Sequence, residues 1–144
     1  MATPEAREAL TDAVLATGGG LFNHAIGLGT RSADPEAASV SPAWRKGVNH
    51  YIAGSTFTEF NKETFDAKYK EASDAFKPIR AITPNSGSYW NESDYYEPNW
   101  EQSFWGVENF KRLKWIKMKY DPSSMFRVWN GVGGTRPETP RGYW

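Results

Sequence analysis

The clearest hydrophobic periodicity in the chain lies between Asn61 and Pro78. Its apolar positions recur at spacings of four, three and four residues: Phe65, Tyr69, Ala72 and Phe76. This spacing places them on one face of a helix. Asn61 is a suitable N-cap, since its side chain can accept a hydrogen bond from the first turn. The pattern therefore predicts a helix that begins after Asn61 and ends before Pro78.

Two further helices are predicted near the ends of the chain. The first begins at Thr3-Pro4-Glu5, where a hydroxyl cap, a proline at the first helical position and an early carboxylate all favour a helix start. It is expected to end at Gly18-Gly19-Gly20. The second covers residues 107–120 and ends at Asp121-Pro122. Its many Lys and Arg residues indicate a solvated face rather than an anion site.

The strand signals are weaker. Strands are predicted at residues 21–29, 44–53 and 125–129. Residues 30–41 are expected to form an exposed loop, and residues 79–83 to lead into the turn at Pro84-Asn85-Ser86-Gly87. Short helical turns are expected to start at Asn99 or Ser103. The tail, residues 135–144, is expected to be irregular.

Composition narrows the function classes. The 144 residues suit one domain or part of a larger one. Aromatic residues make up 15% of the chain, with seven Trp, so we expect incomplete burial of the rings unless a partner surface covers them. Seventeen basic and seventeen acidic residues cancel, which argues against a nucleic-acid or anionic-membrane partner. No apolar run approaches the length of a membrane span.

The usual catalytic and metal-binding patterns are absent. The chain has no Cys and two His, which excludes Cys-based chemistry and makes a multi-histidine metal site unexpected, so no metal ligand is predicted. His24 and His50 are interpreted as structural residues. The glycines at 18–20 and 27–29 do not match a dinucleotide-binding motif. Asn91-Glu92-Ser93 matches a glycosylation sequon, but we interpret Asn91 as buried or lining a site.

One acidic cluster could carry chemistry. Glu92, Asp94 and Glu97 lie close together among tyrosines, and burial beside aromatic rings would raise the pKa of a carboxyl group towards that of a general base. The alternative is a polar strand end with capping acids. The spacing alone leaves both interpretations open.

Several segments resemble, in order, the C-terminal region of the berberine-bridge-enzyme-like FAD-linked oxidoreductases of the fungal branch. The segments are Ser41-Pro42-Ala43-Trp44-Arg45, Ser88-Tyr89-Trp90-Asn91-Glu92-Ser93-Asp94, Glu97-Pro98-Asn99-Trp100, Phe104-Trp105-Gly106, Asn109-Phe110-Lys111-Arg112-Leu113 and Tyr120-Asp121-Pro122. The resemblance is good over residues 38–133 and weak outside them.

The resemblance implies an α+β fold of the vanillyl-alcohol-oxidase type. Residues 1–84 would be the C-terminal part of a substrate domain, with an antiparallel sheet covered by helices on one face. Residues 85–134 would be the berberine-bridge-like segment that packs on the FAD module, and residues 135–144 the irregular tail. Nothing in the chain matches the FAD module itself, so we expect a fragment, a split-gene product or a degenerate copy.

The resemblance also implies site residues and partners. Tyr89 and Asn91 match the motif positions that lie close to the flavin and substrate, and Glu92 stands where many members have a tyrosine base, so Glu92 is a candidate catalytic base. Arg45 is interpreted either as neutralising charge at the domain interface or as part of a surface salt bridge. The implied cofactor is FAD, bound mostly by a module absent from this chain and present in cis or in trans.

Three hypotheses about function follow. The first is oxidation of an alcohol, a sugar or a carbon of a secondary metabolite, with hydride transfer to flavin and O2 as acceptor, by a protein of which this chain alone would be inactive. The second is a non-catalytic binding or partner domain that keeps the fold. The third is a cofactor-independent lyase or cyclase that uses Glu92 and Asp94. Family members are often secreted, but the first residues are unlike a signal peptide, so localisation stays open.

Overall fold

The computed structural model describes residues 3–18, 21–26, 34 and 37–134. The expectations for Gly19-Gly20, for residues 27–33 and for the tail at 135–144 lie outside the described residues. Among the described residues, no helix is long and apolar enough to cross a membrane.

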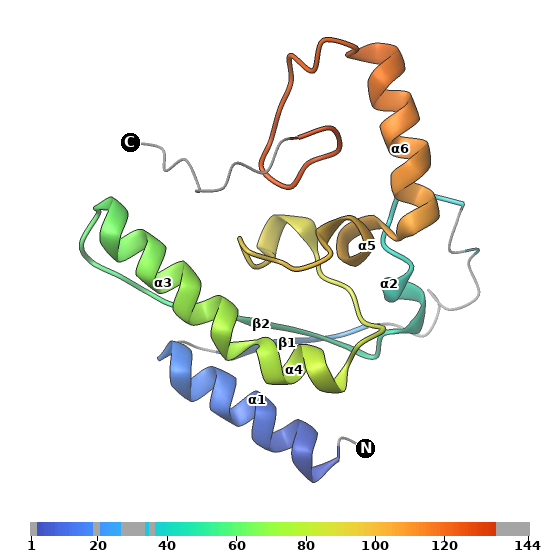
Figure 1. Cartoon of the computed structure of the whole chain (residues 1–144). Coiled ribbons are helices and arrows are strands. Elements are labelled where there is room, and N and C mark those ends of the chain that lie inside the picture. The colour runs from blue at the N-terminus through green and yellow to red at the C-terminus, as the bar shows by residue number, and fades with distance from the viewer. Residues whose placement is uncertain (1–2, 19–20, 27–33, 35–36, 135–144) are drawn as a thin grey trace.

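Three helices pack together on the N-terminal side of the molecule (Figure 1). They are α1 (Pro4–Thr17), α3 (Lys62–Ala75) and α4 (Lys77–Ile82), and α1 lies against both of the others. Thr3 caps α1 by accepting the Ala6 N–H at 3.3 Å, and Gly18 ends it with a φ of 60°, a left-handed conformation that glycine adopts without strain. The predicted helix start and end are confirmed.

Helix α3 also begins and ends as its pattern predicts. The Asn61 side chain accepts the Thr64 N–H at 2.8 Å, and the helix ends at Ala75, before Pro78. Residues 79–83 lead into the turn at residues 84–87 as expected, but most of them belong to a further helix, α4, which follows α3 almost at once. Pro78 lies in the first turn of α4, where a missing N–H breaks no helical hydrogen bond.

The described residues form a two-stranded antiparallel sheet of β1 (Leu21–Ala25) and β2 (Asn49–Ala53). The α+β class with an antiparallel sheet is thus confirmed, and the sheet is small. The predicted strand at residues 44–53 is shorter than expected, since Ala43–Lys46 forms the one-turn helix α2. The register places His24 opposite His50.

The C-terminal part contains η2 (Trp90–Glu92), α5 (Trp100–Trp105) and α6 (Val107–Tyr120). Helix α6 matches its predicted bounds, and the turn expected after Asn99 is α5. The predicted strand at residues 125–129 was wrong. Asp121 instead accepts the N–H groups of Met125 and Phe126, which holds the chain in a turn.

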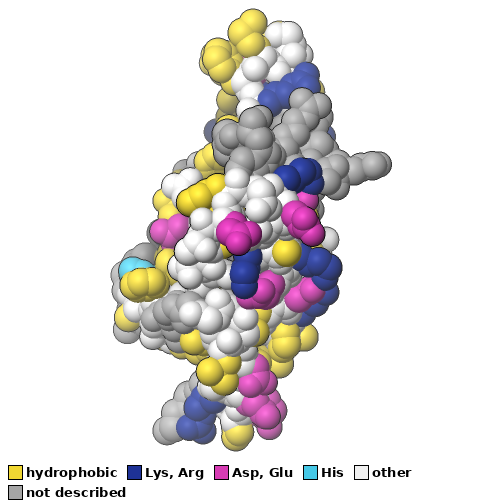
Figure 2. Space-filling view, turned by 90° about the vertical axis from the view of Figure 1, so that its left-hand side faces the viewer, with side chains coloured by type: hydrophobic (Ala, Val, Ile, Leu, Met, Phe, Trp, Pro, Cys, Tyr) yellow, Lys and Arg dark blue, Asp and Glu magenta, His cyan; other side chains and the backbone are white. Residues whose placement is uncertain are grey.

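The hydrophobic core is small. Ala9 and Ala13 are buried on α1, and Phe104 and Phe110 are buried where α5 meets α6. Many large apolar side chains remain exposed, as expected from the aromatic content. Figure 2 shows a group of them at its upper end, the height at which the C-terminal end of α6 and the following loop lie in Figure 1.

Candidate functional site

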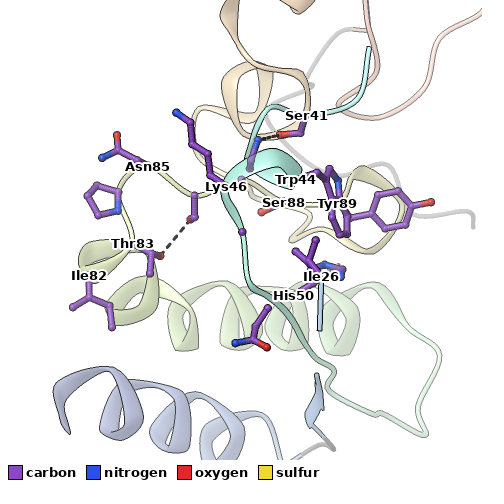
Figure 3. Close-up of a pocket in the computed structure, with 16 residues that line it drawn as sticks. Ile26, Ser41, Trp44, Lys46, His50, Ile82, Thr83, Asn85, Ser88 and Tyr89 are labelled. Atoms are coloured by element: carbon purple, nitrogen blue, oxygen red, sulfur yellow. Dashed lines mark hydrogen bonds between the residues drawn. The ribbon is translucent and has the colours of Figure 1, made fainter. Parts of the chain in front are cut away.

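Two cavities meet at the segment that joins α4 to η2. One has a volume of about 390 Å3 and lies beside α2, as Figure 3 shows; the other, of about 440 Å3, lies beside α3. Their shared lining residues are Asn49, His50, Thr83, Ser86, Gly87, Ser88 and Tyr89. Residues 86–89 therefore form a common wall, with a cavity on each side.

Three rings meet at this wall. The Trp44 ring centroid lies 5.1 Å from that of His50 and 6.1 Å from that of Tyr89, both edge to face. The His50 and Tyr89 centroids are 6.3 Å apart. Figure 3 shows Trp44, His50 and Tyr89 gathered on the same side of the cavity. Such edge-to-face contacts favour a fixed arrangement of the rings.

Tyr89 and Asn91, predicted to bind the cofactor, are joined to each other. The Asn91 Nδ2 atom donates to the Tyr89 hydroxyl at 2.9 Å, which orients the phenol. Tyr89 lines both cavities and remains 40% exposed, so one face is accessible to a ligand. Asn91 is exposed. Their role towards flavin stays a prediction.

Glu92, the candidate base, is exposed and lines the larger cavity together with His50. Burial lowers the pKa of His50 below its ordinary value of 6.5, the charge of Glu92 acts in the opposite direction, and His24 lowers it further. From the sequence, His50 was interpreted as a structural residue. It is a site residue that was missed, because only the pairing of β2 with β1 and the path of residues 86–89 bring it to Tyr89.

The acidic cluster divides into two parts. Glu97 is buried, and it accepts hydrogen bonds from Arg80 Nη2 at 3.0 Å, Ser88 Oγ at 3.2 Å and Ser103 Oγ at 2.7 Å. Asp94 also pairs with Arg80 and caps a turn by accepting the Tyr96 N–H at 2.8 Å. All three carboxylates line the larger cavity, but Asp94 and Glu97 are engaged by Arg80, whereas Glu92 is the exposed member of the cluster.

A close backbone contact joins three segments that are far apart in the sequence, around Ser41, Ser88 and Ser103. The Ser88 N–H donates to the Ser103 carbonyl at 3.1 Å, and Ser41 Oγ donates to the same oxygen at 3.2 Å. A Cβ atom on Gly87 would lie 2.7 Å from that oxygen and 2.8 Å from the Cβ of Ala43. Gly87 is therefore required for this contact.

Among the described residues, Arg45 lacks the surface salt bridge that was considered for it. Within the described part of the chain it has no ion pair, and its buried Nε atom has no hydrogen-bond partner.

The described residues of the site have features that could bind the planar ring system of a flavin, but none that would bind the pyrophosphate of FAD. Tyr89 offers a half-exposed ring with an oriented hydroxyl, a surface against which a planar ring system could pack. The sequence has no glycine-rich motif of the kind that binds a pyrophosphate at a helix N-terminus. In the described ranges, no three His, Asp or Glu side chains are grouped so as to hold a metal ion.

Comparisons with known proteins agree with the motifs. Residues 88–133 match the family model described as "Berberine and berberine like". The FAD-linked oxidoreductase ZEB1 of Gibberella zeae is 40% identical over 108 residues, which are 73% of this chain and 18% of that protein. The VAO-type flavoprotein oxidase VAO615 of Thermothelomyces thermophilus is 39% identical over 99 residues, 67% of this chain and 17% of that protein.

A solved structure shows the same similarity in three dimensions. The crystal structure of the VAO-type flavoprotein MtVAO615 from Myceliophthora thermophila C1 matches with a TM-score of 0.66 and 30% identity, over 90% of this chain and 24% of that one. The resemblance predicted from the sequence is thus confirmed. The chain spans less than a fifth of the length of these two curated relatives.

Proposed function

We propose that this chain, which matches the C-terminal region of the berberine-bridge-enzyme-like FAD-linked oxidoreductases over residues 88–133, forms one wall of a flavin-dependent oxidation site. Beyond those residues it resembles fungal members of the family. The observation that carries the proposal is the Tyr89–Asn91 hydrogen bond at the edge of two cavities, inside the matched segment.

In this proposal Tyr89 and Asn91 contact the flavin ring and the substrate. The wall at residues 86–89 orients the flavin ring and the substrate relative to each other. Bound FAD supplies the redox chemistry, by accepting a hydride and passing the electrons to O2. The chain's own residues bind the substrate, exclude water and accept the proton of its hydroxyl group, with Glu92 as the candidate from the sequence. The substrate is an alcohol, a sugar or a secondary metabolite.

The greater part of FAD would be held by a module that joins this chain in cis or in trans. Two observations support this: the chain has no pyrophosphate-binding motif, and it is similar to a protein named as an FAD-linked oxidoreductase. The chain alone is then expected to be inactive. The pairing of Asp94 with Arg80 argues against the lyase hypothesis, because it occupies one of the two carboxylates that hypothesis needs.

A chimera tests the proposal. The segment of the Thermothelomyces VAO615 protein that matches this chain is replaced by the chain, and the product is purified and examined for flavin absorbance. A yellow protein that changes spectrum on anaerobic addition of an alcohol substrate is expected. In the same chimera, Tyr89→Ala should reduce flavin content or alter the flavin spectrum, whereas Tyr120→Ala, at an exposed position on α6, should not. A folded but colourless chimera would count against the proposal.

A further inference from the structure

We propose that His50 accepts the proton of a hydroxyl group bound at the wall between the two cavities, and that Glu92 stabilises the imidazolium that results. The inference rests on the proposed function, because it deepens the chemistry of the same site. It replaces Glu92 as the base and gives Glu92 a supporting electrostatic role.

The position of His50 supports this assignment. It lies near the start of β2, half-buried, and it lines both cavities. Its ring packs against Trp44 at 5.1 Å and against Tyr89 at 6.3 Å, centroid to centroid, so its orientation is restricted. A hydroxyl group that binds against Tyr89 from either cavity is therefore close to the imidazole.

The charges around His50 favour a neutral ring that can become charged. His24, opposite on β1, lies 6.0 Å away between ring centroids and disfavours a second positive charge, whereas Glu92 favours it. The other titratable or charged side chains that line the two cavities are Lys46, Tyr51, Lys68, Tyr69, Arg80, Asp94, Tyr95 and Glu97. Arg80 is paired with Asp94 and Glu97, and Lys68 with Glu71.

The environment of His50 leaves a ring nitrogen available to accept a proton. Burial lowers the pKa of His50 below its ordinary value, which favours the neutral ring with an unprotonated nitrogen. Glu92 is exposed, where water weakens its interaction with a ligand. The Glu92 charge nevertheless acts on His50, which is the effect needed to stabilise the protonated ring.

The step is a proton transfer. The O–H bond of the ligand breaks and an N–H bond forms on the imidazole, which leaves an oxyanion beside an imidazolium. No electrons are gained or lost in this step.

The experiment uses para-nitrophenol, because its phenolate and phenol forms absorb at different wavelengths, and the 144-residue chain without flavin. Binding is measured by equilibrium dialysis, and ionisation of the bound probe by difference absorbance across pH 5–8. If His50 accepts the proton, the bound probe should ionise about one pH unit or more below the free probe, since an opposite charge a few ångströms away shifts a pKa by that amount. His50→Gln should abolish the shift, and Glu92→Gln should reduce it.

The matched control is His24→Gln, which removes the other histidine and should keep the shift. An independent readout needs no substitution of His50. On binding of the probe, the 15N NMR signals of the His50 ring, assigned with the His24→Gln protein, should move to imidazolium values.

The inference is overturned if the probe fails to bind, if it binds without a shift, or if His50→Gln retains the shift. These results do not depend on flavin. A colourless chimera together with a His50-dependent shift would contradict the proposed function but support His50 as the proton acceptor. A yellow chimera without the shift would support the proposed function and contradict the role of His50.

Discussion

At the scale of single residues, Glu97 is the side chain on which the geometry of the site most depends. It is 5% exposed and joins Arg80 on α4 to Ser88 and Ser103. Glu97→Gln should lower the free energy of unfolding by about 1–3 kcal/mol, because the partly buried Arg80 charge loses one of its two carboxylate partners while the shape is kept. Urea denaturation followed by circular dichroism measures this change.

Glu108→Gln is the matched control. Glu108 pairs with Lys111 on the surface of α6, where both side chains are more than half exposed. Such pairs contribute about 0–1 kcal/mol, so this variant should unfold close to the wild-type midpoint. Equal losses in the two variants would mean that the Glu97 network adds no more than a surface ion pair.

His50 predicts a specific pH dependence of stability. Its pKa in the folded chain is lowered from 6.5, mainly by burial, so folding disfavours the protonated ring. The His50 contribution is then fully present above pH 6.5 and is lost as the pH falls through the lowered pKa of the folded state. His50→Gln should remove this part of the dependence, which comparison of urea midpoints from pH 5 to 8 would reveal. Parallel curves for the two proteins would contradict the burial of His50.

At the scale of elements, Gly87 controls how closely two distant segments approach. Gly87→Ala would place a Cβ 2.7 Å from the Ser103 carbonyl oxygen and should cost about 1–3 kcal/mol of unfolding free energy through overpacking. Gly54→Ala is the control, since a Cβ there meets nothing within 4 Å. Thermal melts of the two variants should differ clearly, and a Gly87→Ala protein as stable as the Gly54→Ala protein would refute the contact.

The cap of α3 gives a second prediction at this scale. Asn61→Ala removes the acceptor of the Thr64 N–H and should cost about 0.5–2 kcal/mol, whereas Asn61→Asp keeps an acceptor and should cost little. Chemical denaturation of both variants measures the difference. If alanine were tolerated as well as aspartate, the cap would be unimportant to the helix.

The same elements show what the sequence could predict. The bounds of α1, α3 and α6 follow from caps and periodicity that act within a few residues, so they could be read locally. The ends of β2 and the path of residues 125–129 depend on partners far along the chain, such as the stacking of Trp129 on Tyr95 at 4.2 Å. Tyr89 and Glu92 were identified from a motif, but His50 was missed because only tertiary contacts bring it to the wall.

At the scale of the whole molecule, the exposed apolar surface dominates. Met125 and Phe126 are 76% and 74% exposed on the loop after α6, and Met118 and Tyr120 on that helix are exposed as well. An apolar area of this kind favours association. Sedimentation velocity should therefore show an average mass that rises with protein concentration. The double variant Met125→Ser/Phe126→Ser should reduce this rise more than Leu15→Ser, the control at an exposed position on α1. A wild-type protein that stays monomeric throughout would contradict the prediction.

The hydrogen bond from Ser41 to the Ser103 carbonyl also has a consequence for synthesis on the ribosome. Its partners are 62 residues apart along the chain. At translation rates of about 5–20 residues per second, Ser41 would wait about 3–12 s before its partner Ser103 is synthesised. During that interval Trp44 and His50 are accessible to chaperones and proteases, so the cell must protect a partly synthesised site.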